Sequence, residues 1–86
     1  MKIYYTNHLQ DKIHERLILE EWIYSTIITP DLKVDHTFQP EIISHFKKIE
    51  AANNKVLRVV LKKLTSNNDE HLVITCYFDR KMRDKL

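Results

Sequence analysis

The stretches KVLRVVLKKL, residues 55–64, and HLVITCYFD, residues 71–79, decide the fold. Both are rich in β-branched and aromatic residues, and turn-forming residues flank each of them. A turn at Asn67-Asn68 between them predicts an antiparallel hairpin. Because this chain contains no glycine, asparagine is the residue best suited to the left-handed conformations that tight turns require.

The register of this hairpin determines which side chains share a face. With a two-residue turn, Arg58 lies opposite Tyr77 and Val60 lies opposite Thr75, and all four point to the same side of the sheet. The other side then carries an apolar layer on which helices can pack. We expect this layer to contain Leu57, Val59, Leu61, Leu72, Ile74, Cys76 and Phe78.

Two further strands are predicted at 32–38 and 42–50, the second turning into 55–64 at Asn53-Asn54. This turn adds Phe46 to the apolar layer. Lys48 also falls on the apolar side, a misfit that a bulge or an edge position would remove. The polar side receives His45 and Lys47, so the predicted polar row is His45, Lys47, Arg58, Thr75 and Tyr77.

The first third of the chain changes from a period of two to a helical period. Residues 2–5 predict a short strand, and Thr6 or Asn7 can cap a helix whose apolar stripe is Leu9, Ile13 and Leu17. A second helix begins near Leu19, presents Leu19, Trp22, Ile23, Thr26 and Ile27, and ends at Pro30. The expected fold is α+β in one domain, 1–86, with two N-terminal helices on one face of a mainly antiparallel four- to five-stranded sheet.

Composition narrows the possible functions. Residues 1–31 hold three Lys or Arg against five Asp or Glu, and residues 32–86 hold eleven against seven, which favours an anionic partner for the second part. The sequence lacks an apolar run of the about 20 residues that span a bilayer, so we expect a cytoplasmic protein without membrane association. No glycine means no phosphate-binding glycine loop, and the five histidines show no ligand spacing, so we expect neither cofactor nor metal. The lone Cys76 is interpreted as a small buried hydrophobe.

Two interpretations of the polar row remain open. It is either a phosphate-binding surface or the solvated side of a half-covered antiparallel sheet. The basic segment after residue 79 could grip nucleic acid or an antitoxin, or form a solubilising tail, and Arg80 is its residue nearest the sheet. His8 and Arg16 could reach the same site, or serve a helix cap and pack beside the second helix.

Several short motifs resemble a family of small bacterial proteins related to the RelE/ParE toxin superfamily. They are Thr6-Asn7-His8 through Arg16, residues 18–21, Pro30-Asp31, Leu57-Arg58-Val59-Val60 and Val73-Ile74-Thr75-Cys76-Tyr77. One departure lies between the helices. The family reads Arg-Gly-Ile-Ser where this chain has Arg16-Leu17-Ile18-Leu19, which lacks the turn glycine and the serine cap.

The resemblance implies a type II toxin of a toxin-antitoxin system with a cognate antitoxin as partner. Its activity would be metal-independent endoribonuclease cleavage of RNA, free or on the ribosome, or, in the ParE branch, non-catalytic poisoning of gyrase. For a ribonuclease, we expect His45 or Tyr77 to transfer protons and Arg58 to stabilise the charge that develops on the phosphate. Phosphate or RNA binding would fall to Lys47, Thr75, Arg80, His8 and Arg16. The alternative is an interaction domain that binds a protein or nucleic acid through the same face.

Overall fold

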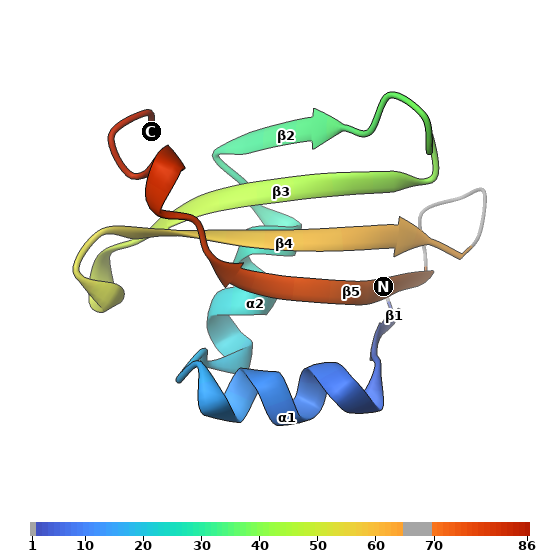
Figure 1. Ribbon diagram of the computed structural model, residues 1–86, viewed down its shortest axis with the longest axis horizontal. Coiled ribbons are helices and arrows are strands. Elements are labelled where there is room, and N and C mark those ends of the chain that lie inside the picture. The colour runs from blue at the N-terminus through green and yellow to red at the C-terminus, as the bar shows by residue number, and fades with distance from the viewer. Residues whose placement is uncertain (1, 65–69) are drawn as a thin grey trace.

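The computed structural model describes residues 2–64 and 70–86, which form an α+β structure with a five-stranded mixed sheet (Figure 1). The strand order is β1-β5-β4-β3-β2. The pair β1 and β5 is parallel and the other pairs are antiparallel. The elements are β1 (Lys2–Tyr5), α1 (Asn7–Glu15), α2 (Glu20–Ile28), β2 (Leu32–Asp35), β3 (Ile42–Ile49), η1 (Glu50–Ala52), β4 (Lys55–Lys63), β5 (Glu70–Phe78) and η2 (Arg80–Met82).

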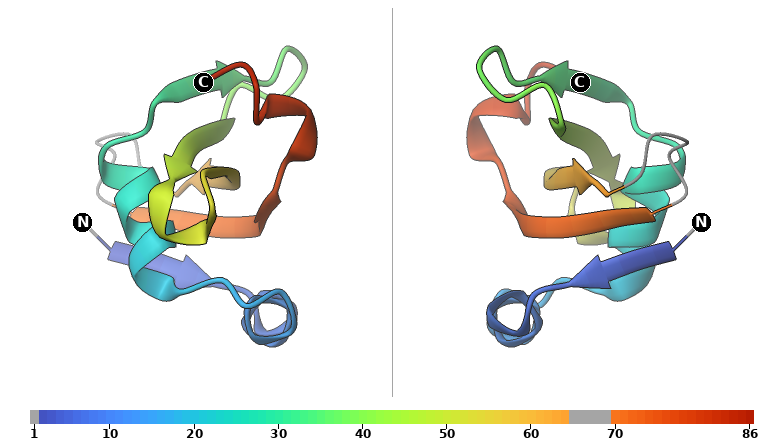
Figure 2. Two further views of the ribbon diagram at one scale, coloured as in Figure 1. Left: turned by 90° about the vertical axis from the view of Figure 1, so that its left-hand side faces the viewer. Right: turned by 90° about the vertical axis from the view of Figure 1, so that its right-hand side faces the viewer.

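The core lies between the two helices and one side of the sheet, here called the helix side. The helices follow β1 instead of starting the chain, and the turn predicted at Asn67-Asn68 lies outside the described residues. Figure 2 shows α2 and η2 on opposite sides of the sheet. The buried core residues are Leu9, Ile13, Ile18, Ile23, Ile27, Ile49, Leu57, Val59, Leu61, Val73 and Cys76.

A glycine-type turn made by leucine joins the two helices. Thr6 caps α1 by accepting a hydrogen bond from Leu9 N, as predicted, and the helix closes at its C-cap, Arg16. Leu17 then adopts a left-handed conformation with φ 55°. Ile18 N donates to Ile13 O and Leu17 N donates to His14 O, the two bonds of a Schellman motif. The left-handed turn points the Leu17 side chain outward, 81% exposed, so its predicted place in the apolar stripe is wrong and Ile18 is buried instead.

Replacing Leu17 with glycine is expected to stabilise the protein by about 1 kcal/mol, since a left-handed conformation costs a residue with a Cβ roughly 1–2 kcal/mol. Little burial is lost because the side chain is exposed. The free energy of unfolding in urea would measure the gain. Leu17→Ala is the control, since it removes the same side chain but keeps the Cβ; equal stability of the two variants would contradict the explanation.

The pairing of β4 with β5 follows the predicted register for half of its length. Arg58 pairs with Tyr77 and Val60 with Thr75, as predicted. A bulge then places an extra residue, Ile74, in β5, because the next pair joins Leu61 to Val73. Because of the extra residue, the side chains of β5 beyond the bulge lie on the opposite sides of the sheet from those predicted.

The predicted helix-side positions of Leu72 and Ile74 are therefore wrong. Val73 is completely buried in the core instead, while Ile74 is 36% exposed and Leu72 is half-buried. Cys76 pairs with Val59 in the part of β5 that keeps the predicted register, and it is fully buried as expected. Burial raises the pKa of its thiol to about 11.

The pairing of β3 with β4 differs from the predicted one by an odd number of residues. Ile49 pairs with Lys55, so the connection contains the five residues 50–54 instead of two. The 3-10 turn η1 takes up the extra residues, and Asn53 and Asn54 follow it in the left-handed conformation. Because side chains alternate along a strand, an odd shift moves every side chain of β3 to the opposite side.

This shift corrects the composition of the polar row. His45 and Lys47 lie on the helix side, and Phe46 and Lys48 lie on the other side, here called the outer side, because Phe46 pairs with Arg58. Lys48 is thus no misfit. The outer side is also less polar than predicted, since Phe46 and Val56 are buried there.

Candidate functional site

Arg58 is the centre of a polar cluster on the outer side. Its Nη1 donates to the Tyr77 hydroxyl at 3.0 Å and lies 3.6 Å from Oδ2 of Asp79. Its Nε and Nη2 both donate to the Ser44 hydroxyl, at 3.3 and 3.2 Å. The guanidinium also lies 5.2 Å from the centre of the Phe46 ring. With its side chain 28% exposed, Arg58 thus connects β3, β4, β5 and the start of the C-terminal segment.

Ser44 is the buried end of this cluster. Its side chain is fully buried, and its hydroxyl lies 3.1 Å from Nε2 of His36 in addition to the two Arg58 donors. Two donors from Arg58 leave the hydroxyl hydrogen free to donate to His36. The hydrogen bonds of the cluster are therefore satisfied internally at Ser44, and at its other end Tyr77 and Asp79 line a neighbouring pocket.

A basic pocket of about 730 Å³ adjoins the cluster where β5 runs into η2. It gathers side chains from α1, the start of β4, the end of β5 and the C-terminal segment. Four cations and one carboxylate line it, so the pocket attracts anions. The lining residues are Arg16, Lys55, Val56, Tyr77, Phe78, Asp79, Arg80 and Arg83.

Arg16 reaches this pocket because β1 is short. The parallel pairing of β1 with β5 ends at Tyr5 and Val73, which leaves the end of β5 without a strand on that edge. Nη1 of Arg16 donates to the Cys76 carbonyl there, at 2.8 Å. A bond across 60 residues of chain thus holds the end of α1 against β5.

The C-terminal segment supplies two further cations. Asp79 caps η2 by accepting from Lys81 N with Oδ1, at 3.0 Å, while its other oxygen faces Arg58. Arg80 begins η2 and Arg83 is its C-cap, three residues later, a spacing at which side chains lie on one face of a 3-10 turn. Arg83 Nη2 donates to the Asn53 carbonyl at 3.2 Å. Both guanidinium groups therefore border the pocket.

His45 cannot perform the proton transfer predicted for it at this site. It is only 7% exposed on the helix side, and its Nδ1 lies 3.3 Å from the Thr26 carbonyl of α2. Burial lowers the pKa of His45, and nearby Lys33 and His71 lower it further, against the effect of the Thr26 bond. His45 therefore lies in the core, where burial favours its uncharged form.

Lowering the pH from 7 to 5 is expected to destabilise the protein. The pKa values of His45 and His71 are both lowered in the folded state, chiefly by burial, so below about pH 6.5 the unfolded chain binds more protons than the folded one. The stability that they contribute is complete above the unfolded pKa and is lost as pH falls. Melting temperatures across this range should decline less steeply for His45→Gln than for the parent, whereas His14→Gln, at an exposed position, should match the parent.

The other predicted binding residues divide into two groups. Arg16, Arg80 and Tyr77 line the basic pocket, and Arg58 contacts Tyr77 directly. Lys47 instead donates to the carbonyl and hydroxyl oxygens of Thr29, at 2.7 and 3.0 Å, where a cation balances the C-terminal end of α2. His8 is exposed at the far end of α1 from Arg16, and Thr75 lies opposite Val60 away from the pocket.

Sequence reasoning missed four residues of the site. They are Ser44, Lys55, Asp79 and Arg83. The spacing of Arg80 and Arg83 was a usable signal, because it suits one face of a short 3-10 turn. No local sequence pattern indicates the pairing of β3 with β4 that brings Ser44 to Arg58.

Two absences complete the description. In residues 2–64 and 70–86, no three His, Cys, Asp or Glu side chains are grouped so that they could hold a metal ion. Over the same ranges, no helix has the length and apolar character needed to cross a membrane.

Compared with known proteins, the chain matches no family model, no curated protein and no solved structure.

Proposed function

We propose that this protein is a cytoplasmic, toxin-like protein of the RelE/ParE type that binds the phosphate backbone of RNA in the basic pocket. The observation that carries the proposal is the convergence of Arg16, Lys55, Arg80 and Arg83 on one concave site with a single carboxylate in its described lining. Cations that are brought together at a cost in mutual repulsion favour an anionic ligand. A chain of phosphates supplies several such charges at once.

The hydrogen bonds within the protein also indicate which N–H donors are available to a phosphate group. Among the described residues, Arg80 makes no side-chain hydrogen bond or ion pair, so its five N–H donors are open to a ligand. Arg16 and Arg83 each give one donor to a carbonyl oxygen and, within residues 2–64 and 70–86, keep the others. Guanidinium groups held in this way are well suited to paired hydrogen bonds with phosphate oxygens.

Cleavage of the bound RNA is the second candidate function, favoured by the position of Tyr77. Its hydroxyl accepts from Arg58 and retains its own hydrogen, which it can donate to the leaving 5′-oxygen. The 2′-hydroxyl of the RNA would attack the phosphorus and pass its proton to Asp79, the carboxylate of the pocket. Arg58 and Arg80 would offset the negative charge of the transition state.

The test uses purified protein and a labelled single-stranded RNA in EDTA. We expect binding in fluorescence anisotropy. If the pocket is catalytic, we also expect metal-independent cleavage that Tyr77→Phe slows at least 100-fold while affinity changes little. If the protein binds no RNA, either alone or with ribosomes, the proposed RNA binding is refuted. Binding without cleavage would restrict the function to interaction.

An antitoxin with an acidic segment would neutralise such a protein by covering the basic pocket. The carboxylates of that segment would compete with RNA for the same guanidinium groups. Growth arrest upon induced expression, relieved by the product of a neighbouring gene, is the expected cellular result. A complex that leaves Arg80 and Arg83 exposed would contradict this mode of neutralisation.

A further inference from the structure

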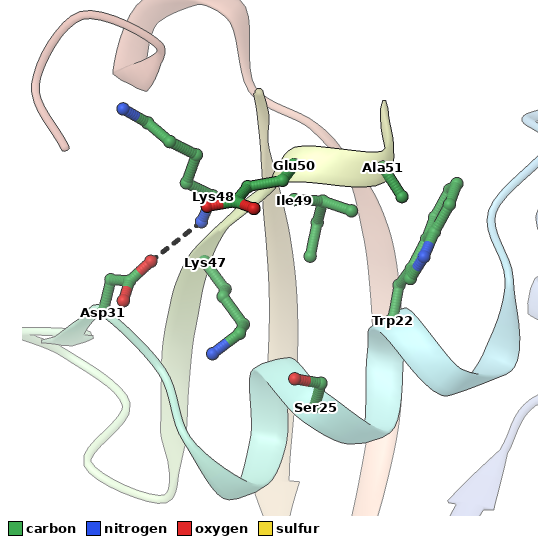
Figure 3. A pocket seen from close by; sticks show the side chains of 8 residues that line it. All are labelled: Trp22, Ser25, Asp31, Lys47, Lys48, Ile49, Glu50 and Ala51. Atoms are coloured by element: carbon green, nitrogen blue, oxygen red, sulfur yellow. Dashed lines mark hydrogen bonds between the residues drawn. The ribbon is translucent and has the colours of Figure 1, made fainter. Parts of the chain in front are cut away.

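A second pocket, of about 520 Å³, lies between α2 and the end of β3 (Figure 3). The indole of Trp22 forms one wall, and Asp31 stands on the opposite side. Ile49 forms part of the lining, and Ser25 and Glu50 add polar groups. An aromatic wall next to polar groups that can orient a ligand is typical of small-ligand sites. The lining is not predominantly basic, so its ligand should differ from that of the basic pocket.

The second pocket adjoins the basic pocket. Ile49 lines the second pocket, and Lys55, its directly paired neighbour on β4, lines the basic one. Paired strands lie about 5 Å apart. The Trp22 ring also packs edge to face against Phe78, which lines the basic pocket, with ring centres 6.1 Å apart. One ligand that carries two different groups at this spacing could therefore occupy both.

The polar groups of the second pocket mainly accept hydrogen bonds. Two lysines line it: the Lys47 amino group is occupied by Thr29, and the Lys48 amino group points away from the Trp22 ring in Figure 3. Asp31 accepts from Lys48 N with Oδ2, as Figure 3 shows, and keeps Oδ1 as an acceptor. Glu50 is exposed and adds a second carboxylate. An ionised carboxylate can only accept hydrogen bonds, so the pocket suits a flat group with N–H donors on its edge.

We propose that the second pocket holds a nucleobase of single-stranded RNA, preferably guanine, while the neighbouring phosphate lies in the basic pocket. The inference rests on the proposed RNA binding and specifies its substrate. Bases of single strands are recognised by stacking on aromatic side chains and by hydrogen bonds along their edges. Guanine offers adjacent N1–H and N2–H donors to a carboxylate, whereas uracil offers one N–H between two carbonyl oxygens that a carboxylate repels.

The single tryptophan of the chain provides the measurement. Trp22 fluorescence is followed while the protein is titrated with an oligouridylate pentamer or with the same pentamer carrying one central guanosine. We expect the guanosine oligomer to quench the fluorescence and to bind about tenfold more tightly. Glu50→Gln should reduce this preference. The matched control is Glu41→Gln, another exposed glutamate, which precedes β3 at its opposite end and should leave the preference unchanged.

Each possible result decides between the two proposals. If both pentamers bind equally and the fluorescence is constant, the base pocket is refuted, but RNA binding stands. If Glu50→Gln and Glu41→Gln reduce the preference equally, the pocket assignment is likewise overturned. If neither pentamer binds, the proposed function fails and the base pocket with it.

Discussion

Replacing Arg80 and Arg83 together with glutamate is expected to weaken RNA binding at least about 100-fold at moderate salt. A hydrogen bond to a charged group contributes about 1.5–3 kcal/mol, and each reversal removes such a bond and adds repulsion. Because both side chains border the pocket from the short turn η2 and its C-cap, the fold should tolerate the change. Anisotropy titrations at several salt concentrations would measure the affinity and its salt dependence.

The salt dependence separates a local effect from a change of net charge. Losing two phosphate contacts should make the slope of log K against log salt shallower by about 1.4 for a single strand. The control is the double variant Lys2→Glu and Lys63→Glu, which changes the net charge equally at the other end of the sheet. If this control weakens binding as much as the pocket variant, the basic pocket is not the binding site.

Replacing Arg58 with alanine is expected to lower the free energy of unfolding by about 3 kcal/mol. The change leaves the buried Ser44 hydroxyl and the Asp79 carboxylate, 14% exposed, without their cation. Each such loss costs about 1–3 kcal/mol, and the contact with the Phe46 ring adds up to about 1. Urea denaturation would measure the difference.

A double-mutant cycle tests whether Asp79 accounts for part of this cost. Asp79→Asn alone should destabilise less than Arg58→Ala, and the two effects should be non-additive because the side chains are in contact. Tyr77→Phe should cost only about 1 kcal/mol, since it removes one hydrogen bond. Additive effects would show that the Arg58 to Asp79 contact, at 3.6 Å, contributes no coupling energy.

The comparison of Arg58 with His45 shows how far sequence patterns could identify the site. The alternation of the two strands predicts the pairing of Arg58 with Tyr77, and the structure has this pair, although the bulge beyond Val60 shifts the rest of the hairpin by one residue. His45 lies on the opposite side from the predicted one because the β3–β4 connection is five residues long. Nothing in the alternation of β3 distinguishes the two sides, since both bury apolar residues.

The basic pocket depends still more on long-range structure. Arg16 joins it through a bond to Cys76, and Arg83 through a bond to Asn53. The basic character of the C-terminal segment was visible in the sequence, but its position beside Tyr77 was not. The capping of η2 by Asp79 and the contact of Asp79 with Arg58 set that position.

The sequence by itself determined the elements of this protein: two short helices, the strands with their alternation, and the pairing of Arg58 with Tyr77. These follow from local preferences and from patterns within a few residues. The tertiary structure decided which side of the sheet each residue of β3 occupies and which cations share a pocket. The physical reason is that one residue more or less in a connection or a bulge moves the side chains of a strand to the opposite side of the sheet, whereas the local sequence pattern hardly changes.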